Sequence, residues 1–145
     1  MKILYHHRVG SKDGQAVHIS ALIEALRELG HTITVVEPPS FRQTGFGSSS
    51  SSLTWLKRHV PRQLYELLEL GYNIVDYARL RRAFLRTPPD IVYERYNLFT
   101  LAGVWLSHRT GTPLLLEINS PLAYEREAFG GLALRNLAVR LEAST

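Results

Sequence analysis

Residues Met1 to Gly30 read MKILYHHRVGSKDGQAVHISALIEALRELG, and they decide the fold expected for the whole chain. Lys2 to His7 is a short run rich in strand formers. A polar turn with Gly10 and Gly14 follows, and apolar residues then recur at helical spacing until Gly30, a typical helix stop: Ile19, Leu22, Ile23, Leu26 and Leu29. The stretch predicts a strand, a turn and an amphipathic helix whose first N–H groups face an anionic ligand.

Composition narrows the function classes. The 145 residues fit a single domain over residues 1–145, and 17 basic against 13 acidic residues leave a net charge of +4. That excess suits a phosphate-bearing ligand but is too small to indicate a nucleic-acid partner. The absence of cysteine excludes disulfides and thiolate metal sites. Without a signal-peptide pattern or a membrane-spanning apolar run, we predict a soluble, cytoplasmic protein.

Three further segments predict strands: His31–Val36, Asp90–Glu94 and Leu114–Ile118. The last is a continuous apolar run, which predicts a strand covered on both faces. Because strands alternate with helical segments, the expected fold class is α/β, a Rossmann-like parallel sheet in three α/β/α layers. Right-handed crossovers favour the strand order 2-1-3-4.

The helical segments between and after these strands carry predicted apolar faces. Trp55 to Arg86 predicts two helical pieces divided near Gly71. Leu98 to Arg109 predicts another helix, and a last one follows the Gly130-Gly131 break. The residues expected to be buried are Leu64, Leu67, Leu68, Ile74, Tyr77, Leu80, Phe84, Leu98, Leu101, Ala102, Trp105, Leu134, Leu137, Ala138 and Leu141.

Two segments are unusual in composition. A serine-rich stretch at about 43–53 has too few apolar residues to offset its ordering entropy, which predicts a flexible loop, either a plain surface loop or a lid over substrate. The segment from Trp55 to Arg86 is basic, and its charged residues are Lys57, Arg58, Arg62, Glu66, Glu69, Asp76, Arg79, Arg81, Arg82 and Arg86. It is either a solvated helix face or a surface for anionic lipid headgroups or a phosphorylated acceptor, with Trp55 as an interfacial anchor.

In the order 2-1-3-4 the strand order reverses between the first and third strands, and ligands of such sheets bind beyond the strand ends at that switch point. The groups expected there are His7, Arg8, the segment 10–18, Glu94, Arg95 and Asn97. The glycine turn matches neither a dinucleotide fingerprint nor a P-loop, so Gly14 either approaches phosphate or only permits a positive φ. His18, in the first turn of the helix, is either a neutral hydrogen-bonding group in the crevice or a packing residue.

Glu117 is the most informative polar residue. A carboxylate within LLLEIN lies close to a buried environment and is costly there without a partner. Arg95 and His7, at the ends of neighbouring strands, are the candidate partners. The pattern leaves open whether Glu117 forms a structural ion pair or binds a substrate hydroxyl.

Several segments together carry a family resemblance. They are ILYHHRVGSKDGQAVHISALIEALRELGHTITVVEPP, PDIVYERYNLFTLAGVWLSHRTGTPLLLEINSPLAYERE and FGGLALRNLA. In this combination the chain resembles the amino-terminal domain of GT-B type glycosyltransferases of family 4. The resemblance implies that this domain binds the acceptor, a glycan or a lipid-linked molecule, while a carboxyl-terminal domain binds the nucleotide-sugar. It also implies transfer with retention in the cleft between the domains, with no metal or other cofactor.

Carried over to this sequence, the turn Asp13, Gly14 and Gln15 matches the family's glycine loop, which faces the donor diphosphate. His18 falls just behind it. Many members place a histidine soon after the strand that corresponds to LLLEI, where this chain has Asn119. Catalytic residues therefore stay unassigned, and the predicted substrate-binding residues are Asp13, Gly14, Gln15, His18, Arg95, Asn97, Glu117 and Asn119.

The domain is expected to be incomplete. Its fourth strand would form an apolar edge unless something pairs with it, so the chain is predicted to be truncated relative to a full GT-B domain and inactive alone. Two other functions fit the same sequence: a nonenzymatic, flavodoxin-like ligand-binding module, and a regulatory partner subunit that completes a separate catalytic chain. The expected location is cytoplasmic, with peripheral contact to an anionic membrane as the alternative.

Overall fold

The computed structural model describes residues 1–10, 14–39 and 60–145. The serine-rich stretch, Asp13, Trp55, Lys57 and Arg58 lie outside these ranges. Four parallel strands form one sheet in the order β2-β1-β3-β4, as predicted. They are β1 (Lys2–His6), β2 (Thr32–Val36), β3 (Ile91–Arg95) and β4 (Leu114–Glu117).

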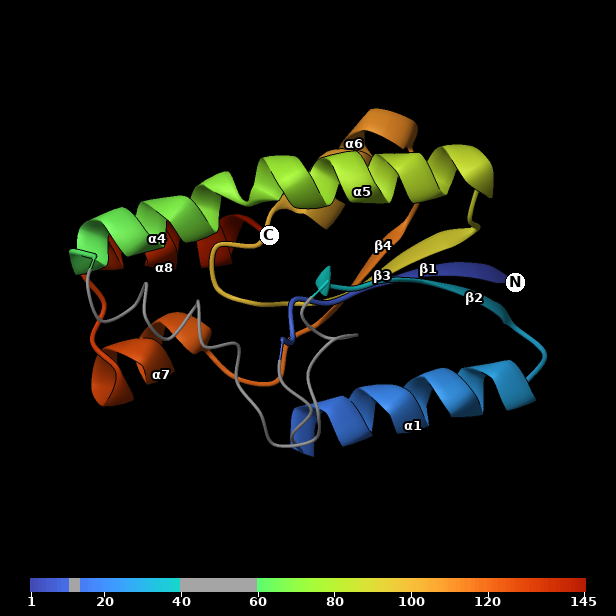
Figure 1. Cartoon of the computed structure of the whole chain (residues 1–145), viewed down its shortest axis with the longest axis horizontal. Coiled ribbons are helices and arrows are strands. Elements are labelled where there is room, and N and C mark those ends of the chain that lie inside the picture. Colours follow the sequence, from blue (N-terminus) through green and yellow to red (C-terminus); the bar gives the residue numbers. More distant parts are fainter. Residues whose placement is uncertain (11–13, 40–59) are drawn as a thin grey trace.

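Helices lie on both sides of the sheet, which confirms the predicted three-layer α/β Rossmann-like class (Figure 1). One side carries α1 (Gly14–Glu28), and the other carries α5 (Asn73–Arg86) and α6 (Ala102–Thr110). Beyond one end of the strands lie α4 (Arg62–Gly71), α7 (Leu122–Phe129) and α8 (Arg135–Ser144). No helix within the described ranges is both long and apolar enough to cross a bilayer.

The core has three parts. Tyr5 packs with Ile19 and Ile23 between the sheet and α1. Leu4, Leu80 and Val92 pack with Ala102 and Leu106 between the sheet and the α5–α6 layer. Beyond the strand ends, Leu98, Phe99, Ala123 and Ala138 join α7 and α8 to the turn after β3. Gly30 and Gly111 end α1 and α6 with positive φ angles of 82° and 69°, as expected of helix stops.

The predicted apolar face of α4 is wrong. Leu64, Leu67 and Leu68 are each 49% exposed, whereas Glu66 is fully buried. The Glu66 carboxylate accepts the N–H groups of Ala133 and Leu134 at 2.9 and 2.7 Å, directly before α8 begins. A carboxylate is favourable at a helix amino terminus, so this contact turns the polar side of α4 inward.

Some of the burials predicted for the next two helices are also wrong. In α5, Leu80 is buried, and Tyr77 and Phe84 pack against the same core, but Ile74 is 70% exposed. The helix predicted from Leu98 begins only at Ala102, and Trp105 is 42% exposed.

β4 is not covered on both faces. Leu115 is 44% exposed because α1 packs over β1 and β2 and does not cover this edge of the sheet. The sequence also gave no indication of α7, whose first N–H groups bond to Glu142 from α8.

Truncation of Leu80 tests the corrected core. Leu80→Ala removes a fully buried side chain, and we expect it to lower the free energy of unfolding by about 2–5 kcal/mol in urea titration. Leu64→Ala, at a position that the periodicity placed in the same core, is the control and is expected to cost less than about 1 kcal/mol. Equal losses at the two positions would contradict the orientation of α4.

Candidate functional site

Glu117 lies at the carboxyl end of β4 and is the centre of a polar cluster beside α1. Its register partner in β3 is Arg95, whose Nη1 donates to Glu117 Oε1. The Asn119 amide donates to the same oxygen at 3.2 Å, and the Tyr93 hydroxyl donates to Oε2 at 3.4 Å. His18 Nε2, from α1, lies 3.4 Å from Oε1. Sheet and helix therefore meet at this carboxylate, which we call the Glu117 cluster.

The Glu117 cluster is shielded on one side and open on the other. The side chains of Glu117 and Arg95 are each 12% exposed, whereas that of His18 is 60% exposed. The hydrogen bond from the Tyr93 hydroxyl to Glu117 Oε2 is long, and a carboxylate oxygen can accept more than one donor. Of the two predicted partners of Glu117, Arg95 is confirmed.

Four of the predicted substrate-binding residues, His18, Arg95, Glu117 and Asn119, therefore come together at the carboxyl ends of β3 and β4, beside the switch point between β1 and β3. Gly14 begins α1 four residues before His18, and among the described residues no atom other than those of its chain neighbours and its own helix lies within 4 Å of the position where its Cβ would be. Both alternatives for Gly14, approach to phosphate and conformational freedom, stay predictions. Gln15 is exposed in the first turn of α1, and Asp13 lies outside the described residues.

Asn97, also predicted to bind substrate, takes part in a turn and not in the Glu117 cluster. Its Oδ1 accepts the N–H of Leu98 at 2.9 Å, and its carbonyl accepts the N–H of Thr100 at 2.9 Å. Such side-chain turns follow strands frequently. Its side chain is exposed, and a role in substrate binding stays a prediction.

Two tyrosines that the sequence analysis overlooked lie behind the Glu117 cluster. Tyr5 and Tyr93 are register partners, and their rings stack with centroids 5.0 Å apart. The Tyr5 hydroxyl is buried and has no hydrogen-bond partner among the described residues. Burial raises the pKa of Tyr5, and the nearby charge of Glu117 raises it further. The sequence does show this feature, because each of two adjacent strands carries a tyrosine near its carboxyl end.

His7 is not the partner of Glu117. It is buried, and its Nε2 lies 3.8 Å from a Glu37 carboxylate oxygen just after β2. Burial lowers the pKa of His7 to about 4, and Glu37 opposes this only in part. The imidazole is therefore neutral at physiological pH.

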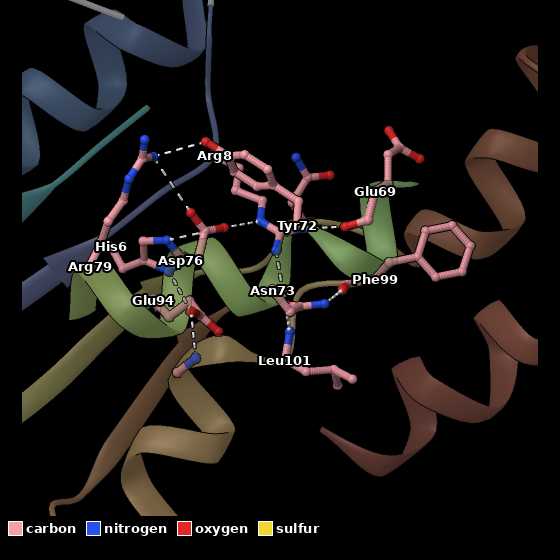
Figure 2. A network of polar contacts seen from close by, with 12 residues as sticks. His6, Arg8, Glu69, Tyr72, Asn73, Asp76, Arg79, Glu94, Phe99 and Leu101 are labelled. Carbon is pink, nitrogen blue, oxygen red and sulfur yellow. Dashed lines mark hydrogen bonds and ion pairs between the residues drawn. The ribbon is translucent and has the colours of Figure 1, made fainter. Parts of the chain in front are cut away.

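Figure 2 shows a second group of charges, the His6 network. His6 and Glu94 alternate along their strands with Tyr5, Tyr93 and Arg95, so the network lies on the opposite face of the sheet from the Glu117 cluster. His6 Nδ1 is 2.5 Å from Glu94 Oε2, and the N–H of Gly103 donates to the same oxygen at 3.0 Å. His6 Nε2 lies 3.8 Å from Asp76 Oδ2, to which Arg8 Nε donates at 2.5 Å. The network ties β1 and β3 to α5 and α6.

Arg8 and Glu94 were expected in the ligand crevice, and this expectation is wrong. Successive side chains of a strand point to opposite faces, so these two residues point away from the Glu117 cluster. Glu94 is fully buried, and Arg8 Nη2 donates to Asn73 Oδ1 at 2.8 Å. The same Asn73 oxygen accepts the Leu101 N–H at 2.7 Å, which fixes the turn before α6.

The pKa values of His6 and Asp76 in the network are shifted in opposite directions, and both shifts favour the charged form. Burial disfavours the charged form of His6, but hydrogen bonds to Asp76 and Glu94 outweigh it, and the pKa of His6 is raised. Burial likewise opposes ionisation of Asp76, but His6 and Arg8 outweigh it, and the pKa of Asp76 is lowered. The network therefore favours a protonated imidazole between carboxylates.

Comparison with known proteins identifies the family. A family model described as a glycosyl transferase 4-like domain matches residues 13–145. The chain belongs to this family. The resemblance to the amino-terminal domain of family 4 GT-B glycosyltransferases is thereby confirmed. No curated protein matches the chain.

Among solved structures, this glycosyltransferase domain is similar to the spinosyn rhamnosyltransferase SpnG complexed with thymidine diphosphate. The two are 17% identical with a TM-score of 0.55, and the likeness shows a shared fold. The alignment covers 80% of this chain and 34% of that one. This chain therefore spans about a third of the length of SpnG.

The glycosyltransferase domain has no obvious metal centre in its described part. Within residues 1–10, 14–39 and 60–145, no three His, Asp or Glu side chains are grouped so that they could hold a metal ion. Glu117 is held by Arg95, Asn119 and Tyr93, which is the environment of a carboxylate that accepts hydrogen bonds. The cluster can therefore bind hydroxyl groups.

Gly103→Ala tests the close approach of α6 to the His6 network. A Cβ at this position would lie 2.6 Å from Glu94 Oε2, so the buried carboxylate has to move and its bond to the Gly103 N–H is lost. We expect a loss of about 1–3 kcal/mol in the free energy of unfolding, measured in urea. Gly71→Ala, where a Cβ meets nothing within 4 Å, is the control and is expected to be neutral or stabilising.

His6→Gln tests the charge of the network. Because the pKa of His6 is raised on folding, its stabilising contribution is fully present below the unfolded value of about 6.5 and is lost as the pH rises through the folded value. We therefore expect the stability difference between wild type and His6→Gln to shrink as the pH is raised from about 6. Urea unfolding at several pH values measures it, with His108→Gln on the exposed side of α6 as the control. A difference that grows with pH would show that His6 is buried in its neutral form.

Proposed function

We propose that this chain is the acceptor-side half of a retaining glycosyltransferase. The complete enzyme transfers a sugar from a nucleotide-sugar to an acceptor glycan or a lipid-linked acceptor, in glycan or glycolipid biosynthesis. The single observation that carries the proposal is the Glu117 cluster, which lies at the carboxyl ends of β3 and β4, beside the switch point between β1 and β3, in a chain of the glycosyl transferase 4-like family. Ligands of open parallel sheets bind there.

The roles of the residues follow from their exposure and their contacts. Glu117 Oε2 accepts a hydrogen bond from a substrate hydroxyl, and Arg95 holds the carboxylate in place and offsets its charge. His18, exposed at the rim, is positioned to contact the same ligand from α1. The open space around Gly14 lets a diphosphate approach the first N–H groups of the helix.

The donor site lies in a further domain under this proposal. The alignment with SpnG covers 34% of that protein, which leaves room for a second domain of the kind that binds a nucleotide-sugar in GT-B enzymes. β4 is the last strand in the order of the described sheet, so its outer edge is available for additional structure beside it. We expect the 145-residue chain alone to give no turnover with a panel of nucleotide-sugars, and the protein joined to its donor domain to transfer sugar even in the presence of EDTA.

Glu117→Gln tests the role of the carboxylate in the enzyme that contains both domains. The substitution keeps the size of the side chain but removes the charge that strengthens a hydrogen bond to a hydroxyl. We expect kcat/KM to fall by about tenfold to a hundredfold, and the anomeric configuration of the product, followed by NMR, to remain that of the donor.

Glu127→Gln is the matched control for this experiment. Glu127 forms an ion pair with Arg135, is 43% exposed, and lies on α7 rather than at the sheet edge. Its substitution is expected to leave kcat/KM unchanged. Equal activity of both variants would exclude Glu117 from substrate binding, and turnover by the isolated chain would show that no second domain is required.

A further inference from the structure

The outer surface of α4 and α5 carries an apolar stripe that nothing in the described chain covers. Six large apolar side chains of these helices are between 41% and 70% exposed: Leu64, Leu67, Leu68, Ile74, Val75 and Leu85. Their spacing places them on one side of a helix. We call them the outer stripe.

The two helices form nearly one rod (Figure 1). Tyr72 between them has helical angles, its N–H bonds to the Leu68 carbonyl at 2.9 Å, and its carbonyl accepts the Asp76 N–H at 3.1 Å. The rod from Arg62 to Arg86 is about 37 Å long at 1.5 Å per residue. The outer stripe therefore extends along most of one continuous surface.

The charges on this surface have one sign. Arg81, Arg82 and Arg86 are exposed on α5, and none of them has an ion-pair partner in the part of the chain that the structure describes. The three carboxylates of the rod face elsewhere. Glu66 and Asp76 are buried, and Glu69 accepts a hydrogen bond from Arg126 Nη1 at 2.6 Å. The exposed side of the rod thus combines apolar and cationic groups without acidic ones.

We propose that the outer stripe and its three arginines bind an anionic lipid surface. A helix with an apolar side and adjacent cationic residues lies in the plane of a membrane interface, with its apolar side chains at the acyl boundary and its arginines at lipid phosphates. A second copy of the chain is a poor occupant, because this surface offers no carboxylate to the partner's arginines.

This surface lies on the opposite side of the sheet from the Glu117 cluster. The core beneath α5 contains Leu4 and Leu80, whereas the core beneath α1 contains Tyr5 and Ile19. Membrane binding through the rod therefore leaves the α1 side open to soluble ligands. The proposal is independent of the proposed glycosyl transfer.

Vesicle flotation tests the proposal with the 145-residue chain. We expect the protein to float with vesicles of phosphatidylcholine mixed with phosphatidylglycerol, to stay behind with phosphatidylcholine alone, and to be released by added salt. Equal recovery with both vesicle types, or none with either, would overturn the proposal.

Matched variants locate the surface. Ile74→Ser is expected to reduce vesicle partitioning at least about threefold, whereas Leu29→Ser, with nearly the same exposure but directly after α1, is expected to leave it unchanged. Arg82→Gln is expected to reduce it about fivefold, with the exposed Arg27→Gln on α1 as the control. Circular dichroism confirms that each variant is folded.

Light scattering tests the alternative that a second copy of the chain covers the outer stripe. A monomer in solution is expected. A dimer that Ile74→Ser dissociates would assign the outer stripe to a second copy of the chain and overturn the membrane proposal. Equal loss of vesicle binding in the α5 and α1 variants would overturn it as well.

Discussion

The constraint on which the structure depends is the burial of charge at the carboxyl ends of β1 and β3. Glu94 is fully buried and Asp76 nearly so, and isolated carboxylates at such positions would be very costly. His6 lies between them and Arg8 closes the network, so each carboxylate has a hydrogen-bonded cation. Because these four residues come from β1, β3 and α5, compensating the charge also fixes where the strand ends and the helix lie.

Because successive side chains of a strand point to opposite faces, the His6 network and the Glu117 cluster lie on different faces of the sheet. His6 and Glu94 point to the α5 side, where the charges of the His6 network bond to one another. Their neighbours Tyr5, Tyr93 and Arg95 point to the α1 side and support Glu117, whose carboxylate oxygens can each accept more than one donor. One sheet edge therefore carries a closed network on one face and an open cluster on the other, and rigidity of the first holds the second in place.

The sequence predicted what depends on local pattern. The strand, turn and helix of residues 1–30, the parallel sheet and its order follow from short-range periodicity and crossover handedness. The pairing of Glu117 with Arg95 was also accessible, since both lie at the ends of adjacent strands. In contrast, Arg8 and Glu94 were misplaced because a strand end does not reveal which face carries the ligand.

The errors in α4 and α7 have a common physical origin in contacts between distant residues. Helix periodicity assumes that apolar residues face the core, but Glu66 of α4 caps α8 and Glu142 of α8 caps α7, so carboxylates replace local capping residues at both helix starts. Neither bond can be inferred from neighbouring residues, because the partners are 68 and 20 positions apart. Because the Glu66 carboxylate bonds to the start of α8, the leucines on the other side of α4 face outward. The same inward bond that joins α4 to α8 thus leaves the α4 leucines of the outer stripe exposed at the surface.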